Sequence, residues 1–361
     1  MYVLFQMANE SKQLQPCIIQ YCLVAVFSIT NVIDTCRKPP PIMHLSVIVL
    51  GYLGSQFKDT PHLGGSQIVR FGISQLREEL PEEILMQLLG VHADQACSLA
   101  DALYLGESIV EQGSAISGLH ALDTQHHLLV QPVSLQVQRD RVFLSEIVRL
   151  SAEEYEVLSD LFNQHFAEEG IKFIQSTTQQ YWFIELGAAL QCNTYLAQKA
   201  IYQDVHPFKL KGLDAKMFNK IMNETQMLLH EHPINERRQA QQKAAVNSVW
   251  CSGNARFSVD PEKRVSALVG QGALIKGLAR YCQLPLLADF HSLNQLPEHV
   301  LVLSETMHGV DWNQLFQMVK KRTVNQLTIY LPNMNHTLQI QLSPWDCWKF
   351  WKRLPNLEQF I

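Results

Sequence analysis

The run HLSVIVLGYLGS, residues 44–55, constrains the fold more than any other stretch of this 361-residue chain. Its β-branched and leucine residues end in glycines, as in a buried strand that leads into a loop. The run is therefore expected to be the first strand of an α/β sheet.

The residues before this run contain the apolar stretch CIIQYCLVAVFSITNVI, which Gln20 and Asn31 interrupt. The stretch is too short and too polar for a membrane span. A signal peptide is the other reading, but Lys12 is the only basic residue before the stretch, and no small-residue cleavage site follows it. The prolines of RKPPPI then stiffen the chain. We expect residues 1–42 to be an extension outside the fold, which begins at Met43.

The composition is that of a soluble globular protein, with 47% hydrophobic and 17% charged residues. The net charge of −5 argues against a nucleic-acid partner, which usually requires a basic surface. The eight cysteines form no C-x-x-C pair and are expected to be free thiols in a reducing compartment. These features predict a cytoplasmic protein without a membrane or nucleic-acid partner.

The middle of the chain predicts a compact α+β lobe. The alternating segment 128–148 breaks at Arg139–Asp140, which is typical of a hairpin. Ser151 and Glu154 have the spacing of a capping box that opens a helix. Strand-like runs IKFI and YWFIEL follow.

The flanking segments predict further helices and strands. Leucines at helical spacing between residues 67 and 105 indicate two helices. A helix from Asp214 must end near His232, because Pro233 follows. Later segments predict a helix, a buried strand and a hairpin, at residues 265–284, 299–303 and 327–342.

The polar segment LLHEHPINERRQAQQKAAVNSVW, residues 228–250, is the first candidate site. His230 and His232 lack the spacing of a metal-binding H-E-x-x-H motif and are expected to interact with helix-end carbonyls. Arg237 and Arg238 could clamp a carboxylate or phosphate, although adjacent arginines on a solvated turn are commoner. The pair His126–His127 has weaker support as a metal site and is expected in a polar loop.

The segment GQGALIKG, residues 270–277, is the second candidate. Glycines before a helix expose amides that can bind a phosphate, with Lys276 as the counter-charge. Close helix packing explains the same glycines. Both alternatives stay open at this point.

Several segments together resemble a known family. NETQMLLHEHPINERRQAQQKAAVNSVWCSGNARF, residues 223–257, resembles the segment H-P-[VI]-N-x-x-R…N-[SMI]-[IVL]-W-x-x-G of archaeal-type cofactor-independent phosphoglycerate mutases. It is more similar still to the bacterial RpfE-type regulatory proteins, which are mutase-like. MHLSVIVLG, RDRVFLSE, LFNQHFAEEGIKF, YWFIEL and WKFWKR extend the resemblance over most of residues 43–353.

The resemblance implies an α/β fold with an alkaline-phosphatase-like sheet and a smaller inserted α+β lobe. The mutase-like core would comprise residues 43–120 and 235–361, and the inserted lobe residues 121–234. The polar segment would then cross between the two lobes, where a cleft is expected.

The metal-binding motifs of the mutases are not matched. Their first strand ends in V-L-D-G-x-G-D, whereas Gly51 and Ser55 stand at the two aspartate positions here. His308 and Asp311 match a later metal motif only loosely. Because the mutases need two metals and a phosphoryl-carrying serine or threonine, the resemblance implies no metal and no catalytic residues here.

We therefore expect a non-catalytic binding or regulatory protein without a cofactor. Asn235, Arg238, Asn247 and Lys276 are the predicted contacts of a small phosphorylated or carboxylated ligand. The alternative is an active mutase or phosphatase that uses Mn²⁺ or Mg²⁺. The tryptophans of PWDCWKFW are expected to cap the core, and the other reading is a docking surface for a protein partner.

Overall fold

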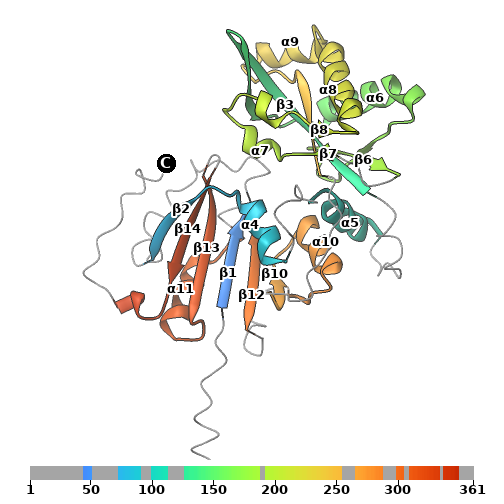
Figure 1. The fold of residues 1–361 in the computed structure, drawn as a ribbon. Helices are drawn as coiled ribbons and strands as arrows, with labels where there is room; N and C mark the ends of the chain where they lie inside the picture. The colour runs from blue at the N-terminus through green and yellow to red at the C-terminus, as the bar shows by residue number, and fades with distance from the viewer. Residues whose placement is uncertain are drawn as a thin grey trace, which may run out of the picture. The chain divides into compact units, whose positions relative to one another are not determined.

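The structure is a computed structural model (Figure 1). It describes residues 44–50, 72–90, 99–112, 126–187, 192–253, 265–287, 298–304, 309–333 and 336–348. Residues 1–42 lie outside these ranges, so the predicted extension is outside the described residues.

A seven-stranded sheet contains the predicted first strand, β1 (His44–Val49), near its centre. β1 pairs in parallel with β12 (His299–Ser304) and with β13 (Gln326–Asn333). The full order is β11-β10-β12-β1-β13-β14-β2, and the remaining strands are β10 (Ala267–Val269), β11 (Leu286–Leu287), β14 (His336–Leu342) and β2 (Ile73–Arg77). β14 and β2 are antiparallel to their neighbours.

Both faces of this sheet are buried at β1, as the apolar composition of that strand requires. Ile48 and Leu50 belong to the core on one face, together with leucines from α4 (Pro81–Leu88), α5 (Leu99–Gln112) and α10 (Ala273–Tyr281). Val47 and Val49 belong to the core on the other face, together with Leu315 and Phe316 of α11 (Trp312–Lys320). The mixed α/β class predicted from the sequence is confirmed.

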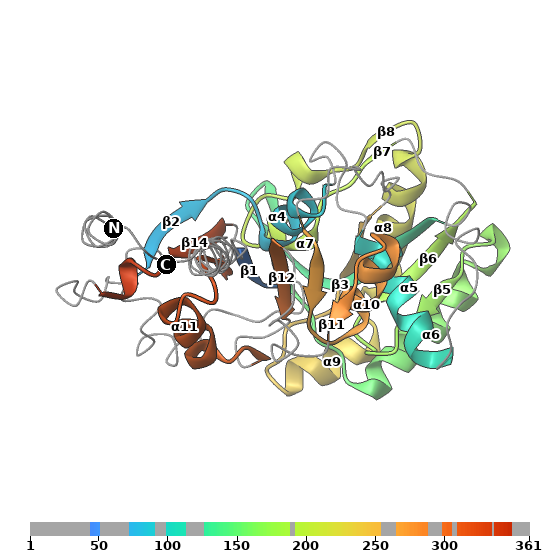
Figure 2. The same cartoon turned by 90° about the horizontal axis from the view of Figure 1, so that it is seen from below.

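A five-stranded sheet forms the second main part of the structure. Its order is β4-β3-β6-β5, with β9 on the other side of β3. The strands are β3 (His126–Gln138), β4 (Arg141–Ile147), β5 (Phe173–Gln175), β6 (Trp182–Leu186) and β9 (Ser248–Ser252). α6 (Ala152–His165) and α8 (Ala215–Leu229) share one core cluster with residues of β3, β5, β6 and β9. Figure 2 shows α6 beside β5 and β6.

Shorter elements complete the described structure. They are α7 (Ala197–Ala200), α9 (Pro233–Ala240), β7 (Cys192–Asn193), β8 (Lys211–Gly212) and the 3-10 turns Ala167–Glu169, His206–Phe208 and Asp346–Trp348. α9 begins at Pro233 itself, in the first helical position, where the missing amide hydrogen of proline costs no helical hydrogen bond. β2 is an element that the helical spacing of this region did not predict.

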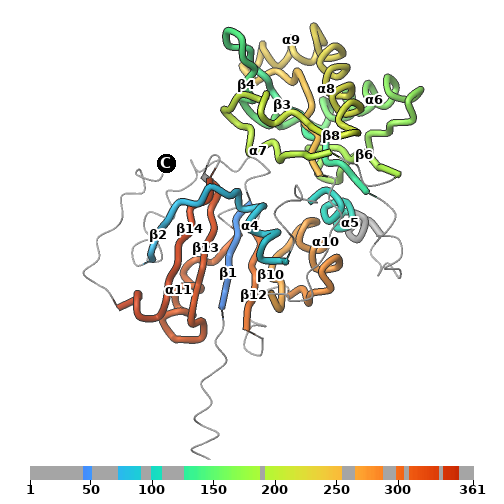
Figure 3. Tube along the Cα trace, viewed as in Figure 1, coloured from blue at the N-terminus to red at the C-terminus, as the bar shows by residue number. Residues whose placement is uncertain are grey.

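The chain enters the five-stranded sheet after α5 and leaves it after β9 (Figure 3). Because β9 pairs with β3 from Leu129↔Ser252 to Val133↔Ser248, the sheet continues past residue 234, where the sequence placed the end of the inserted lobe. Residues 248–252 therefore pair within the five-stranded sheet, and Val246, Val249 and Cys251 belong to its core.

Two helices pack closely through glycines. A Cβ on Gly106 of α5 would overlap the backbone carbonyl of Ala273, and a Cβ on Gly277 of α10 would overlap that of Ala102. The absence of side chains lets the two backbones approach. Close packing therefore explains Gly277, one of the glycines for which the sequence left two readings open.

The local predictions for the middle of the chain are confirmed. β3 and β4 form a hairpin around Arg139 and Asp140. The Ser151 hydroxyl accepts from the Glu154 amide at 3.2 Å, and the Glu154 carboxylate accepts from the Ser151 amide at 2.8 Å. Each side chain thus satisfies a free amide at the start of α6.

Two predictions are wrong. His126 and His127 belong to strand β3 and are buried, rather than lying in a polar loop. Trp345 and Trp348 are 73% and 61% exposed, so these two side chains do not cap the core. Trp351 lies outside the described residues.

Candidate functional site

Most of the positions that would correspond to the metal ligands of the mutases lie outside the described residues. These positions are Gly51, Ser55 and His308. Asp311 caps α11, where its carboxylate accepts from the Gln314 amide at 2.9 Å. Within the described ranges, no group of three or more His, Cys, Asp or Glu residues is arranged to hold a metal ion.

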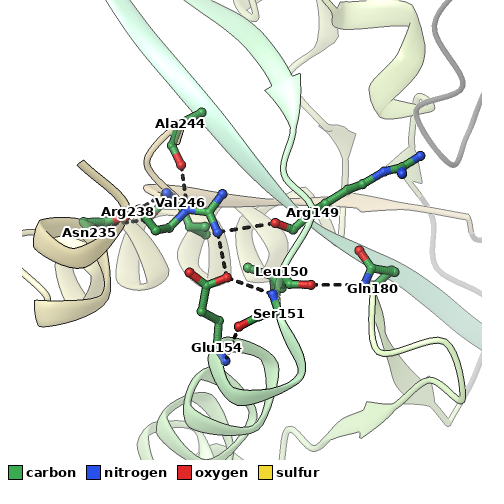
Figure 4. A network of polar contacts seen from close by, with 9 residues as sticks. All are labelled: Arg149, Leu150, Ser151, Glu154, Gln180, Asn235, Arg238, Ala244 and Val246. Carbon is green, nitrogen blue, oxygen red and sulfur yellow. Dashed lines mark hydrogen bonds and ion pairs between the residues drawn. The ribbon is translucent and has the colours of Figure 1, made fainter. Parts of the chain in front are cut away.

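Arg238 is held in a network inside the protein (Figure 4). Its side chain is 4% exposed and donates to the carbonyl oxygens of Ala244 (2.6 Å) and Arg149 (3.3 Å). It also donates to the Glu154 carboxylate at 2.7 Å. Burial alone would raise the pKa of Glu154, but the Ser151 amide and the Arg238 charge outweigh it and lower this pKa below its usual 4.5.

Asn235 and Asn247 fasten the segment that follows α9. The Asn235 amide nitrogen donates to the carbonyls of Leu229 and Val246, and its oxygen accepts from the Val246 amide at 2.8 Å. The Asn247 side chain makes a pair of bonds with the backbone of Leu135, at 2.7 and 2.8 Å. The structure thus brings three predicted ligand contacts to one region, where they hold the backbone.

Lys276 lies apart from these three residues on α10. It is half-buried, and its ammonium group makes no hydrogen bond with any residue that the structure describes. Lys276 is therefore the predicted contact with a free donor group.

The two histidines of the polar segment lie at helix ends, but the His232 ring does not interact with the helix-end carbonyls that the sequence predicted for it. His230 follows the last residue of α8, and its amide donates to the Gln226 carbonyl. The His232 ring precedes α9 and accepts from the Ile234 amide at 3.3 Å. Burial, followed by the charge of Arg237, lowers the pKa of His232, which favours this neutral accepting ring.

A buried cluster of Asp101 and two histidines was missed by the sequence interpretation. Asp101 of α5 accepts from the backbone amide of His127 at 2.7 Å and lies 3.1 Å from its Nδ1. Tyr104 stacks on the His127 ring at 3.8 Å between centroids. The second carboxylate oxygen of Asp101 lies 3.9 Å from His126 Nδ1. All three charged or titratable side chains are less than 10% exposed.

A second buried carboxylate joins the same helix to the five-stranded sheet. Glu107 accepts from the Tyr181 hydroxyl at 2.6 Å and from the Thr177 amide at 2.9 Å. The Tyr155 hydroxyl lies beside them and donates to the Tyr181 carbonyl at 2.7 Å. Burial raises the pKa of Tyr155 to about 12, so this hydroxyl stays protonated as a donor.

The buried side chains whose polar atoms lack hydrogen-bond partners are not the ones that the sequence predicted as ligand contacts. Asn235, Arg238 and Asn247 use their polar groups within the protein, whereas His127 Nε2 and His126 Nδ1 are buried without a hydrogen-bond partner. Asp101 and His127 are 26 positions apart, so their contact has no local sequence signal. The contact with Asp101 fixes the orientation of the His127 ring, and the Nε2 atom of this ring lies buried without a partner.

Comparisons with known proteins show a similarity that covers part of the chain at low identity. No protein-family model matches the chain. A segment of 146 residues is 22% identical to the 2,3-bisphosphoglycerate-independent phosphoglycerate mutase of Methanosarcina mazei and covers 38% of this chain and 36% of that protein. The corresponding enzyme of Methanosarcina acetivorans is 23% identical over the same shares. The aligned segment thus spans about a third of the length of these curated relatives.

Two solved structures are similar over a larger share at lower identity. A Pyrococcus horikoshii protein has a TM-score of 0.41 and 14% identity, with 84% of this chain and 88% of that chain covered. A cofactor-independent phosphoglycerate mutase from Thermoplasma acidophilum has a TM-score of 0.35 and 14% identity, with 84% and 90% covered. In the described part of the chain, no helix has the length and apolar character to cross a membrane. The 146-residue segment is the part of this chain that is similar, at low identity, to 2,3-bisphosphoglycerate-independent phosphoglycerate mutases.

Proposed function

We propose that this protein is a phosphoglycerate-mutase-like binding or regulatory protein, of the RpfE type, that works in the cytoplasm without a two-metal site. The proposal rests on the carboxyl end of β1, because open α/β sheets bind their ligands beyond this end of the strands. Leu50 and Leu303, at this end of β1 and β12, supply no carboxylate for a metal ion. Here Leu50 is 1% exposed and donates its amide to the Ser304 carbonyl at 3.0 Å. Leu303, at the same end of β12, is 5% exposed.

The sequence resemblance supports the same proposal. The metal aspartate of the mutases corresponds to Gly51, directly after Leu50, and their second aspartate to Ser55. A two-metal site needs several carboxylates to balance the charge of both ions and to fix their positions. Asp311, the aspartate of the loosely matching later motif, caps a helix.

We also propose that the protein binds a small phosphorylated or carboxylated ligand. Lys276 is its primary contact, because the ammonium group has no hydrogen bond to a described residue and lies near the start of α10. Asn235, Arg238 and Asn247 take the role of holding the segment between α9 and β9. A protein partner on the exposed Trp345 and Trp348 is the second part of the proposed regulatory role.

The first test measures metal content and turnover on the full-length chain. The protein is purified with manganese in all buffers, its bound metal is measured by mass spectrometry, and conversion of 3-phosphoglycerate to 2-phosphoglycerate is followed. We expect neither stoichiometric metal nor turnover. Two bound ions with turnover would refute the proposal.

The second test addresses the ligand. Titration calorimetry with 3-phosphoglycerate compares the natural protein with Lys276→Ala and with Lys320→Ala, an exposed lysine on α11. We expect Lys276→Ala to weaken binding at least tenfold and Lys320→Ala to leave it unchanged. Equal affinities of the two variants would remove Lys276 from the site.

An active metal-dependent mutase or phosphatase is the alternative function. The 146-residue similarity to two proteins named as phosphoglycerate mutases favours it. This alternative requires Mn²⁺ or Mg²⁺ and a serine or threonine that carries the phosphoryl group. The turnover assay above decides between the two functions.

A further inference from the structure

One face of the five-stranded sheet carries buried polar atoms without hydrogen-bond partners. The atoms are His127 Nε2 and Gln131 Oε1 on β3 and Ser252 Oγ on β9. Their residues are 4%, 2% and 1% exposed, respectively. Buried polar groups are nearly always hydrogen-bonded in folded proteins, so three such atoms on neighbouring strands require an explanation.

The strand register places the three side chains on the same face. Alternate residues of a strand point to the same side, so His127, Leu129 and Gln131 share a face of β3. Ser252 pairs with Leu129 and is therefore a diagonal neighbour of both His127 and Gln131, at about 7–8 Å between Cα atoms. Phe183 of β6 also pairs with Leu129 and contributes an aromatic ring to this face.

Elements from outside the sheet cover this face. Asp101 and Tyr104 of α5 contact His127 at one end. Ala197 of α7 shares a core cluster with Trp250, which pairs with Gln131 on β9 and β3. The next residue of α7, Gln198, is 4% exposed, and both polar atoms of its side chain also lack partners.

The contact with Asp101 fixes what His127 can offer. A carboxylate accepts hydrogen bonds, so in the neutral form of the ring the proton lies on Nδ1, which is 3.1 Å from Asp101 Oδ1. Nε2 is then an acceptor without a donor. Gln131 adds a second acceptor, and the Ser252 hydroxyl and the Gln198 amide can donate as well as accept.

We propose that this face binds a small neutral molecule that carries several hydroxyl groups, a polyol. Its hydroxyls donate to His127 Nε2 and Gln131 Oε1 and exchange hydrogen bonds with the Ser252 hydroxyl. A charged ligand is disfavoured, because burial of a charge is costly and these side chains are less than 5% exposed. This site is distinct from the anion contact at Lys276 and does not depend on it.

The experiment follows the histidine rings of the full-length protein by two-dimensional ¹⁵N–¹H NMR. The His127 signals are assigned by their loss in His127→Gln, and glycerol and sodium D-glycerate are the probes. We expect glycerol to shift the Nε2 resonance of His127 in a saturable way and D-glycerate to shift it at least tenfold less at equal concentration. The assay is run with and without Mg²⁺, which is diamagnetic and leaves the signals sharp, so its outcome is separate from that of the metal and turnover test.

A matched pair of variants tests the position of the site. Gln131→Leu removes a buried acceptor, whereas Gln136→Leu changes an exposed glutamine on the same strand. We expect Gln131→Leu to weaken the glycerol effect at least tenfold while raising the thermal midpoint of the protein alone, and Gln136→Leu to change neither. A His127 spectrum that glycerol leaves unchanged, as when buried water alone satisfies these atoms, would overturn the proposal. Equal glycerol responses of the two leucine variants would overturn it as well.

Discussion

Asp101 Oδ1 lies 2.7 Å from the backbone nitrogen of His127 and 3.1 Å from the Nδ1 atom of the same residue. One carboxylate oxygen therefore fixes both the first residues of β3 and the orientation of a buried imidazole. Asp101 belongs to α5, which packs on α10 beside the seven-stranded sheet, so this contact ties the two sheets together.

Removal of this carboxylate should destabilise the fold. Asp101→Ala leaves a buried amide and a buried ring nitrogen without their acceptor, and we expect a loss of about 3 kcal/mol in the free energy of unfolding. The control is Asp204→Ala, which removes an exposed carboxylate that accepts from the His206 amide at 3.0 Å and should cost less than about 1 kcal/mol. Urea unfolding of both variants measures the difference, and equal losses would contradict the assignment.

Arg238 should be a stability residue, with its neighbour as the control. Arg238→Ala leaves the carboxylate of Glu154 without its ion pair and removes the hydrogen bonds to the carbonyls of Ala244 and Arg149, so the expected loss is about 3–5 kcal/mol. Arg237→Ala breaks an exposed pair with Glu153 at 3.3 Å and should cost less than about 1 kcal/mol. Chemical denaturation distinguishes the two, and a neutral Arg238→Ala would show that the network does not hold this segment.

The stability of the protein should depend on the ionisation of Glu154. Its pKa is lower in the folded protein than its usual 4.5, so the folded state favours the charged form. The stabilisation is present above pH 4.5 and is lost as the pH falls through the lower, folded pKa. Relative to Glu154→Gln, the natural protein should lose more unfolding free energy between pH 7 and pH 3.5. Parallel pH profiles of the two proteins would argue against this contribution.

The contact between α5 and α10 should not tolerate a methyl group. In Gly277→Ala the new Cβ would overlap the backbone carbonyl of Ala102, and a backbone cannot move aside as a flexible side chain can. We expect a loss of about 3 kcal/mol, the upper part of the range for overpacked cores. Gly187→Ala is the control, because no atom lies within 4 Å of its added Cβ. Thermal and urea unfolding should separate the two variants clearly.

The exposed tryptophans should contribute little to folding. Trp345→Ala removes a ring that is 73% exposed and stacks with Arg322 at 5.4 Å, so a loss below about 1 kcal/mol is expected. Trp182→Ala removes a fully buried ring and should cost about 3–5 kcal/mol. A large loss in Trp345→Ala would restore the core-capping role that its exposure contradicts.

Local sequence signals predicted much of the fold. The apolar run of β1, the hairpin of β3 and β4 and the capping box at Ser151 are set by residues close to one another in the chain. Pro233 likewise marked the junction between α8 and α9. β2 was missed because it is short and half-exposed, and its pairing with β14 joins residues more than 250 positions apart.

The candidate site could be predicted less well, for a physical reason. A dense polar segment looks the same in sequence whether it binds a ligand or holds its own backbone, and Arg238 does the latter. His127, in contrast, sits in a buried strand, and only the long-range contact with Asp101 distinguishes it from an ordinary core histidine. Burial and partners decide the chemistry of such residues, and both depend on the tertiary fold.

The pairing of Leu129 with Ser252 has a consequence for how this fold could be taken apart or built. The strand by which the chain enters the five-stranded sheet lies beside the strand by which it leaves, so the two ends of this 127-residue span meet as neighbours. Such a span can be inserted into another protein at a single position in that protein's chain, because its two ends are neighbours. A fragment from residue 126 to residue 252 would keep both β3 and β9. A fragment that ends at residue 234 would instead lose β9 and expose the edge of β3. An exposed strand edge can pair with other chains, so this fragment should aggregate.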